Sequence, residues 1–339
     1  MPLAPLLFTL KPNRRHCLCC CLALALILVG CEEKKNGIYR VGILSGLHAF
    51  SAVSLGFKDG MKELGYIEGK NITYDLRESN ADSAESQRIL RQFVADQVDL
   101  ILVYPTEPAV EAKSATSKSG TPVIFCNAGI EWNNLVNNVR QPGKNLTGVR
   151  FPGPDLIVKR LEILVDLAPW VKRLYVPYDP SYPNNAPALE MLRKAVSSKG
   201  ISLVEAPVSS AKDIRDDLEA KAKSENIRID AIQIMPETLT QSPAGWALIT
   251  EFAAKHKLPI VGAAPFSARK GAVFSLAPDP YEIGRLAAPM ADKILRGIPP
   301  GTIPVVTPEA HLRLNCTLAR ELGLKIPNGI LKMAHEVYR

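Results

Sequence analysis

Side chains that could bind a small molecule follow the predicted strands of this chain. In an open parallel sheet, ligands bind beyond the carboxyl ends of the strands, where helix N-termini favour anionic groups such as a carboxylate. Ser45 and Thr106 offer hydroxyls for a carboxylate. The side chains that could pair with an ammonium are Glu107, Asp179 and Glu237. The other candidates are an amide, an imidazole and four aromatic stacking faces: Asn127, His48, Phe50, Tyr104, Tyr178 and Phe266. These types predict a site for a zwitterionic, partly apolar ligand.

Several of these residues also have a purely structural interpretation. Thr106 could cap a helix that starts at Glu107, which is a frequent role of threonine. Glu107 and Glu237 could each complement a helix dipole. Tyr178 could pack in the core, and His48 could be a solvent-exposed loop residue. Both interpretations stay open at this point.

The sequence shows no comparable pattern of catalytic residues. After residue 30 the chain contains no Gly-x-Ser-x-Gly elbow, no His-Glu-x-x-His and no glycine-rich nucleotide loop. The four histidines of that part, at positions 48, 256, 311 and 335, are far apart in the sequence. We therefore expect no catalytic residue, no metal site and no cofactor, and the absence argues against an envelope hydrolase.

A lipid attachment site is predicted at Cys31. Leu28-Val29-Gly30-Cys31 resembles a bacterial lipobox and ends an uncharged apolar run, residues 17–29, which follows a basic stretch. This run fits a signal peptide and is shorter than the roughly 20 residues that span a bilayer. We expect residues 1–30 to be a lipoprotein signal peptide and residues 31–37 a lipidated tether. An uncut membrane anchor and a twin-arginine signal (Arg14-Arg15) are the alternatives.

Composition narrows the possible partners. The chain has 339 residues and a formal net charge of +7, of which three positive charges lie in the predicted leader. Basic residues are scattered along the rest, which opposes a nucleic-acid partner. Only Cys126 and Cys316 would remain besides the lipidated cysteine. They lie in different predicted elements and are expected to be buried free thiols, with a disulfide between them as the alternative in an oxidising compartment.

The elements that position the candidate loops alternate between strands and amphipathic helices, which is typical of βαβ units and a parallel sheet. The first series predicts strands at Tyr39–Leu44, Ile72–Leu76, Asp99–Tyr104 and Pro122–Asn127, and helices at Ser51–Leu64, Ser83–Gln97 and Glu107–Ser119. Residues 137–154 are rich in Asn, Gly and Pro and predict a lobe boundary.

A second series of the same kind follows. Its predicted strands are Arg173–Tyr178, Ser202–Pro207, Ala231–Met235, Pro259–Gly262 and Ala272–Leu276. Its predicted helices are Leu156–Asp166, Ala188–Lys199, Ala211–Ser224, Trp246–His256 and Tyr281–Arg296. The pattern predicts an α/β protein with two Rossmann-like lobes.

Several segments, in order along almost the whole chain, resemble one family of substrate-binding proteins. Residues 56–72, Gly-Phe-Lys-Asp-Gly-Met-Lys-Glu-Leu-Gly-Tyr-Ile-Glu-Gly-Lys-Asn-Ile, are similar to a signature of the ABC-transporter periplasmic components that include tryptophan/tyrosine-binding members. Further matches are Arg140–Val149, Lys159–Glu162, Pro278–Arg285 and Leu322–Pro327.

The resemblance implies a type I periplasmic-binding-protein fold with a hinge. An N-terminal lobe of residues 38–150 plus about 277–310 would face a C-terminal lobe of residues 151–276, with residues 311–339 unassigned. It implies a small-molecule ligand, possibly an amino acid, captured by hinge closure and delivered to an ABC permease with its ATPase. The protein would lie at the periplasmic or extracytoplasmic face of the cell envelope, held to a membrane by its lipid anchor. A receptor that senses a ligand and signals to a membrane partner is the alternative.

The chain departs from the family pattern in its predicted ligand loops. Pro105-Thr106 replaces a common Gly-Thr, and Asn127-Ala128-Gly129 replaces a common Gly-Asp-Pro. Leu276 stands where a tyrosine is frequent. The resemblance therefore implies the fold more firmly than the solute.

Overall fold

The computed structural model describes residues 37–131, 133–224 and 227–339. The predicted signal peptide, the lipobox and Cys31 lie outside these residues. Residues Ile38–Arg339 form one compact unit. Within the described ranges, no helix has the length and apolar character needed to cross a membrane.

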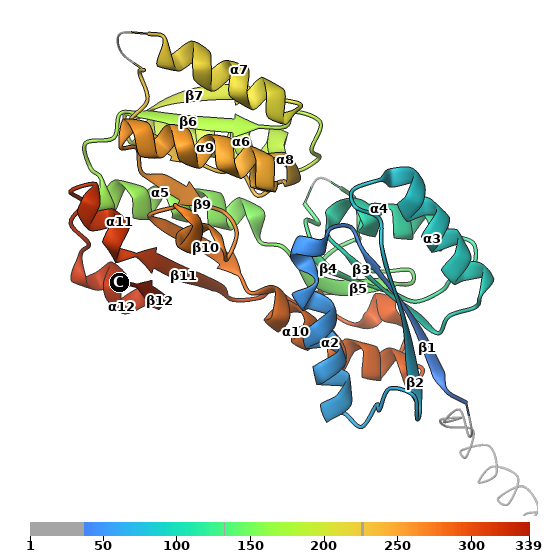
Figure 1. Ribbon diagram of the computed structural model, residues 1–339. Coiled ribbons are helices and arrows are strands. Elements are labelled where there is room, and N and C mark those ends of the chain that lie inside the picture. The colour runs from blue at the N-terminus through green and yellow to red at the C-terminus, as the bar shows by residue number, and fades with distance from the viewer. Residues whose placement is uncertain (1–36, 132, 225–226) are drawn as a thin grey trace, which may run out of the picture. The chain divides into compact units, whose positions relative to one another are not determined.

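Two β-sheets organise this unit (Figure 1). The first is entirely parallel and has the order β2-β1-β3-β4-β5. Its strands are β1 (Tyr39–Ser45), β2 (Ile72–Glu78), β3 (Leu100–Tyr104), β4 (Val123–Ala128) and β5 (Leu146–Arg150). The strand β3 is central and buried on both faces, which explains its continuous apolar run Leu-Ile-Leu-Val-Tyr.

Helices cover both faces of the first sheet. A core cluster containing Phe57 and Ile283 lies between one face and the helices α2 (Ala52–Glu63) and α10 (Pro280–Leu295). A second cluster, with Phe93 and Ala109, lies between the other face and the helices α3 (Ser83–Ala95) and α4 (Thr106–Ala115). We call this sheet with its helices the first lobe.

The second sheet has the order β12-β11-β10-β9-β8-β6-β7. Its strands are β6 (Arg173–Tyr178), β7 (Ser202–Pro207), β8 (Ala231–Gln233), β9 (Ile260–Gly262), β10 (Phe274–Pro278), β11 (Ala310–Asn315) and β12 (Ala334–Tyr338). All neighbours in this sheet are parallel except β10 and β11, which pair antiparallel. The final 30 residues of the chain therefore complete the second sheet.

Helices also cover both faces of the second sheet, and together they form the second lobe. One face carries α5 (Gly153–Leu167), α6 (Asn185–Ser198), α11 (Cys316–Glu321) and α12 (Asn328–Met333). The other carries α7 (Ala211–Ala222) and α9 (Pro243–His256), and the short α8 (Thr238–Gln241) precedes α9. The expected α/β class with two lobes is confirmed.

The chain passes between the two sheets at three points among the described residues. It enters the second lobe after β5, returns to the first lobe after β10 through α10, and re-enters the second lobe between Val306 and β11. Two of these crossings touch, because the Arg150 Nε donates to the Thr307 hydroxyl at 2.8 Å. Figure 1 shows α10 beside α2, although more than 200 residues separate them.

Glycines explain how closely α2 and α10 approach. A Cβ added at Gly284 would lie 2.0 Å from the carbonyl oxygen of Val53, and one added at Gly56 would lie 1.9 Å from the carbonyl oxygen of Tyr281. Only hydrogen fits at these positions, so Gly56 of the Gly56–Ile72 segment and Gly284 of the Pro278–Arg285 segment let the two helices approach each other closely.

Some elements differ from the sequence predictions. The strand β5 lies inside residues 137–154, where the density of Asn, Gly and Pro predicted only a boundary. The strands β11 and β12 were not predicted either, and the antiparallel β11 departs from an all-parallel second sheet. Cys126 and Cys316 are both free thiols, as expected, but Cys316 is half-buried because it starts the surface helix α11.

Candidate functional site

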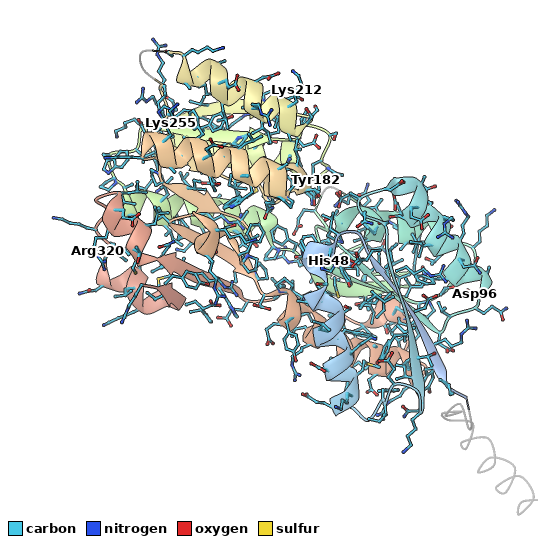
Figure 2. All side chains as sticks on the ribbon, viewed as in Figure 1. His48, Asp96, Tyr182, Lys212, Lys255 and Arg320 are labelled. Atoms are coloured by element: carbon cyan, nitrogen blue, oxygen red, sulfur yellow. The ribbon has the colours of Figure 1, made fainter. Side chains whose placement is uncertain are left out.

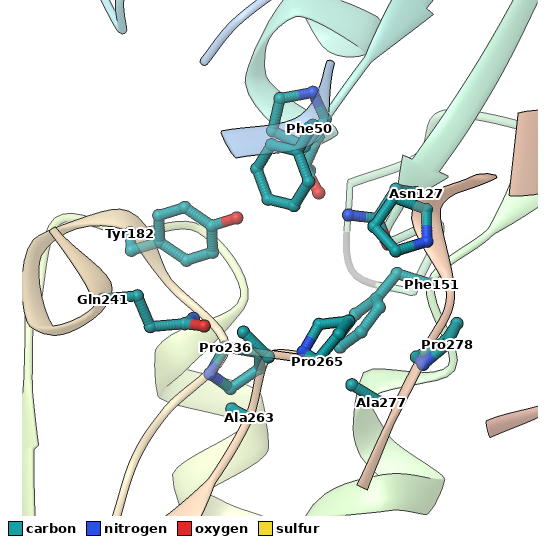
Figure 3. A pocket seen from close by; sticks show the side chains of 14 residues that line it. Phe50, Asn127, Phe151, Tyr182, Pro236, Gln241, Ala263, Pro265, Ala277 and Pro278 are labelled. Carbon is teal, nitrogen blue, oxygen red and sulfur yellow. The ribbon is translucent and has the colours of Figure 1, made fainter. Parts of the chain in front are cut away.

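A pocket lies where the loops of both lobes meet (Figure 3). Every segment that lines it follows a strand at its carboxyl end, as expected for open parallel sheets. From the first lobe and the crossings come Phe50, Pro105, Thr106, Asn127, Phe151 and Pro280. From the second lobe come Tyr182, Pro236, Gln241, Ala263, Ala264, Pro265, Ala277 and Pro278. No charged side chain lines the pocket in the described part of the chain.

Three of the first-lobe residues are shaped by local backbone features. Phe50 ends a single 3-10 turn, His48–Phe50, that directly precedes α2. Thr106 is the first residue of α4 and follows a cis Tyr104–Pro105 peptide bond. Asn127 has a φ of 51° at a register shift in β4, which turns this strand residue out of the regular pleat.

Aromatic and apolar faces make most of the pocket wall. Figure 3 shows the rings of Phe50, Tyr182 and Phe151 around the same space, with the Gln241 amide at one side. The Gln241 Nε2 donates to the carbonyl oxygens of Met235 and Glu237 at 3.2 and 3.0 Å. These bonds hold the side chain in place and leave its Oε1 to accept from a ligand.

Thr106 links the two lobes at the edge of the pocket. Its hydroxyl oxygen accepts from the Gly129 N–H at 3.0 Å and from the Asn184 Nδ2 of the second lobe at 3.2 Å. The Asn133 Nδ2 in turn donates to the Asn184 Oδ1 at 3.2 Å. An added Cβ at Gly129 would lie 2.7 Å from the Asn184 Nδ2, so a larger residue there would push this amide aside. Because the Thr106 oxygen accepts both bonds, its own proton is left for a third partner, and the Tyr182 hydroxyl in the pocket wall is one.

Burial controls the ionisation of the acidic and phenolic groups beside the pocket. It raises the pKa of Tyr182, and the nearby Glu107 carboxylate raises it further. Burial is also the largest cause of the raised pKa of Glu107 and of Glu237. These side chains therefore favour their neutral forms more than exposed groups would.

The structure brings three of the predicted site residues to the pocket, namely Phe50, Thr106 and Asn127. Thr106 does not cap α4, because its side chain bonds to Gly129 and Asn184 and Pro105 holds the N-cap position. Glu107 lines an adjacent cavity instead of this pocket.

The remaining predicted residues are occupied in other ways. The Ser45 hydroxyl is buried and donates to the Leu47 carbonyl oxygen at 2.9 Å. Tyr104 is fully buried in the core of the first lobe. His48 is exposed, with its Nδ1 3.2 Å from a Glu78 oxygen, as its alternative interpretation held.

Four predicted residues of the second lobe also lie outside the pocket lining. Tyr178 packs against the core that contains α5 and α6. The Asp179 carboxylate accepts from the Ser181 N–H and hydroxyl. Glu237 caps α8 by accepting from the N–H groups of Leu239 and Thr240. Phe266 packs edge-on against Trp246, with ring centroids 5.6 Å apart.

The sequence gives little signal for three residues that do line the pocket. Tyr182 lies in the loop four residues beyond the end of β6, and Gln241 belongs to a helix of four residues. Phe151 lies in the segment that was interpreted as a boundary. Figure 2 shows that Tyr182 and His48 come from different lobes, which no local pattern reveals.

Buried arginines fix the crossing that follows β10. The Arg160 Nε and Nη2 both donate to the Leu276 carbonyl oxygen, at 3.0 and 2.7 Å, and complete burial lowers the pKa of Arg160 to about 9. Arg313 bonds to Asp279 and Glu336, each at 3.0 Å. Asp279 also caps α10. The two arginines thus hold the strand end that carries Ala277 and Pro278 into the pocket.

Comparison with known proteins gives the geometry a context. The sequence model of a family described as "ABC transporter substrate binding protein" matches residues 42–338. A tyrosine-binding protein of Clostridioides difficile is 26% identical over 277 residues, which cover 81% of this chain and 77% of that protein.

Two solved structures share the fold over most of their length. A domain from Streptococcus pneumonia in complex with L-Trp has a TM-score of 0.79 and 25% identity, covering 89% of this chain and 100% of that one. A conserved domain protein from Vibrio cholerae has a TM-score of 0.78 and 29% identity, covering 88% of this chain and 99% of that one.

Proposed function

The chain belongs to the family of ABC transporter substrate-binding proteins, and from this premise we propose that it captures an aromatic amino acid between its two lobes. The family is one of extracytoplasmic solute-binding proteins rather than enzymes. The ligands named for the relatives from Clostridioides difficile and Streptococcus pneumonia, tyrosine and L-Trp, motivate the choice of ligand class.

The composition of the pocket is the observation that supports this proposal most. Phe50, Phe151 and Tyr182 offer aromatic faces around one space. Offset or edge-on ring packing would favour an aromatic side chain by about 0.5–1.5 kcal/mol for each pair beyond the burial of its area. The Thr106 hydroxyl and the Asn127 amide offer hydrogen-bond donors for a carboxylate.

Binding would proceed by hinge closure. The pocket has a volume of about 50 Å³, which is room for only a few water molecules. An aromatic amino acid needs more room than this, so it would enter when the lobes separate about the three crossings, and they would close around it less far than they do without it. A solute that contacts both lobes stabilises the closed form, because it binds that form more tightly than the open one.

Delivery to a permease with its ATPase would follow from closure, since the permease would recognise the closed form. Acyl chains on Cys31 would keep the receptor at the membrane, because each buried CH₂ contributes about 0.8 kcal/mol. Metabolic labelling with a fatty acid tests this anchor. Label that persists in Cys31→Ser would contradict it.

A thermal-shift screen of the full chain in detergent tests the ligand class. A ligand at 100 times its dissociation constant adds about 2.7 kcal/mol to the free energy of unfolding. L-tryptophan or L-tyrosine is expected to raise the melting temperature, while glucose and inositol are not. If aromatic and branched amino acids all leave it unchanged, the proposed ligand class is wrong.

A further inference from the structure

A second cavity, of about 140 Å³, adjoins the pocket. The two share Pro105, and the next two residues point one to each: Thr106 lines the pocket and Glu107 lines the second cavity. Ser79, at the end of β2, and Glu111, one turn after Glu107 on α4, line the same cavity. Thr238 lines it from the second lobe, so this cavity also lies between the lobes.

Three buried oxygen atoms of this cavity lack a hydrogen-bond partner within the described residues. They are the Ser79 Oγ, the Glu107 Oε2 and the Glu111 Oε2. Ser79 is only 2% exposed. Buried polar atoms are almost always paired, and leaving one unpaired is costly. Three such oxygens on residues that line one cavity point to a hydrogen-bond donor that is bound there.

The acidic side chains around the cavity indicate that this donor is positively charged. Glu107 and Glu111 have no ion pair among the described residues, and the groups whose charges raise the pKa of Glu107 are Glu111, Glu237 and Asp179. Glu107 and three further carboxylates therefore interact here, and among the described residues the largest contributions to the pKa of Glu107 include no cation. A positively charged donor would relieve both the repulsion and the unpaired oxygens.

The other two carboxylates are committed elsewhere. Both oxygens of Glu237 accept from the first turn of α8, and Asp179 accepts from Ser181. Neither residue lines the pocket or the second cavity. The unpaired Glu107 and Glu111 oxygens are thus better placed to accept from an ammonium than the other two acids.

We propose that the cavity lined by Ser79, Glu107 and Glu111 is a subsite for a protonated amine of the solute. The inference rests on the proposed function, because it takes the solute to be an aromatic amino acid. The amine would lie in this cavity, on one side of Pro105, and the aromatic ring in the pocket on the other side. An ammonium has three N–H donors, and three residues that line this cavity each have a buried oxygen without a partner. Ser79 and Glu111 become specificity-determining residues.

Calorimetric titration of the full chain in detergent tests the subsite with L-tryptophan and indole-3-propionate, which differ only in the amine. Wild-type protein is expected to bind L-tryptophan at least about tenfold more tightly, since hydrogen bonds to charged groups are the stronger ones. Glu111→Gln and Ser79→Ala should each shrink that ratio by weakening L-tryptophan alone. Glu190→Gln, an exposed glutamate paired with Lys194, is the matched control and should keep the wild-type ratio.

The outcomes separate the two proposals. If both compounds bind wild-type protein equally well, or if the variants weaken both compounds alike, the subsite is wrong while the receptor function stands. If no aromatic compound binds wild-type protein, the proposed function fails and the subsite with it.

A free inorganic cation is the other source of positive charge. Replacement of sodium and potassium by choline should leave L-tryptophan binding unchanged, and its loss would overturn the amine assignment. Should Glu111→Gln not fold, Ser79→Ala carries the test.

Discussion

The Asn184 Nδ2 of the second lobe donates to the Thr106 hydroxyl oxygen of the first lobe at 3.2 Å. This contact joins the loop before α6 to the first turn of α4, and both ends lie beside the pocket. The Thr106 oxygen accepts from Gly129 as well, so its proton is left for the Tyr182 hydroxyl or for a ligand. The hydrogen bond from Asn184 therefore forms only when the two lobes are in contact, and it also orients the Thr106 hydroxyl beside the pocket.

Asn184→Ala should weaken L-tryptophan binding about twofold to tenfold. The reason is that a neutral hydrogen bond contributes about 0.5–1.5 kcal/mol, and this one is available only when the lobes meet. Titration calorimetry measures the change. Asn138→Ala, in an exposed loop, is the control, and equal affinities for the two variants would contradict a role for the contact in closure.

Phe50→Ala and Phe266→Ala should have opposite effects: the first should change ligand affinity and the second the free energy of unfolding. Phe50 lines the pocket, so its truncation is expected to weaken aromatic ligands about tenfold or more. Phe266 packs on Trp246 instead, so its truncation should lower the free energy of unfolding and leave the affinity unchanged. Urea unfolding together with ligand titration separates these effects. An affinity loss in Phe266→Ala alone would reverse the assignment.

Gly284→Ala should destabilise the protein by about 1–3 kcal/mol or more, because the new methyl group would meet the Val53 carbonyl oxygen at 2.0 Å. Gly329→Ala is the matched control, since a Cβ there meets nothing within 4 Å in the helix α12. That change should stabilise slightly. Equal midpoints of urea unfolding for the two variants would show that α2 and α10 do not pack as closely as described.

Glu107→Gln should make the ligand-free protein more stable at neutral pH. Burial raises the pKa of Glu107 above its ordinary value of 4.5, with Glu111, Glu237 and Asp179 adding to the shift. The stabilisation from this group is therefore present below about pH 4.5 and is lost as the pH rises through its folded pKa. The free energy of unfolding, measured from about pH 4 to pH 8, should fall less steeply in the variant. An unchanged slope would mean that Glu107 is ionised without penalty.

The alternating strands and helices were predictable because their signal is local. The bounds of β6 and β7 agree with the prediction, since short apolar runs between turn residues define them. The strand β11 carries His311 and Arg313, and the buried position of Arg313 depends on Asp279 and Glu336, which are distant in sequence. No local sequence pattern predicts that these two distant carboxylates pair with the buried Arg313.

The site was predictable at the level of loops but not of side chains. The carboxyl ends of β1, β3 and β4 do carry Phe50, Thr106 and Asn127 to the pocket. Tyr104, two residues before Thr106, points into the core because the central strand is covered on both faces. Tyr182 and Gln241 lie in the pocket wall only because the second lobe packs against the first. No local sequence pattern predicts how the two lobes pack.

A crystal structure of the protein grown with saturating L-tryptophan would show directly whether the space between the lobes is the binding site. We expect one bound molecule between the lobes, with its ring among Phe50, Phe151 and Tyr182, its carboxylate at the Thr106 hydroxyl and its ammonium towards Glu107 and Glu111. Tryptophan bound outside this region, or an interlobe space that stays free of it at saturating concentration, would contradict the proposed function.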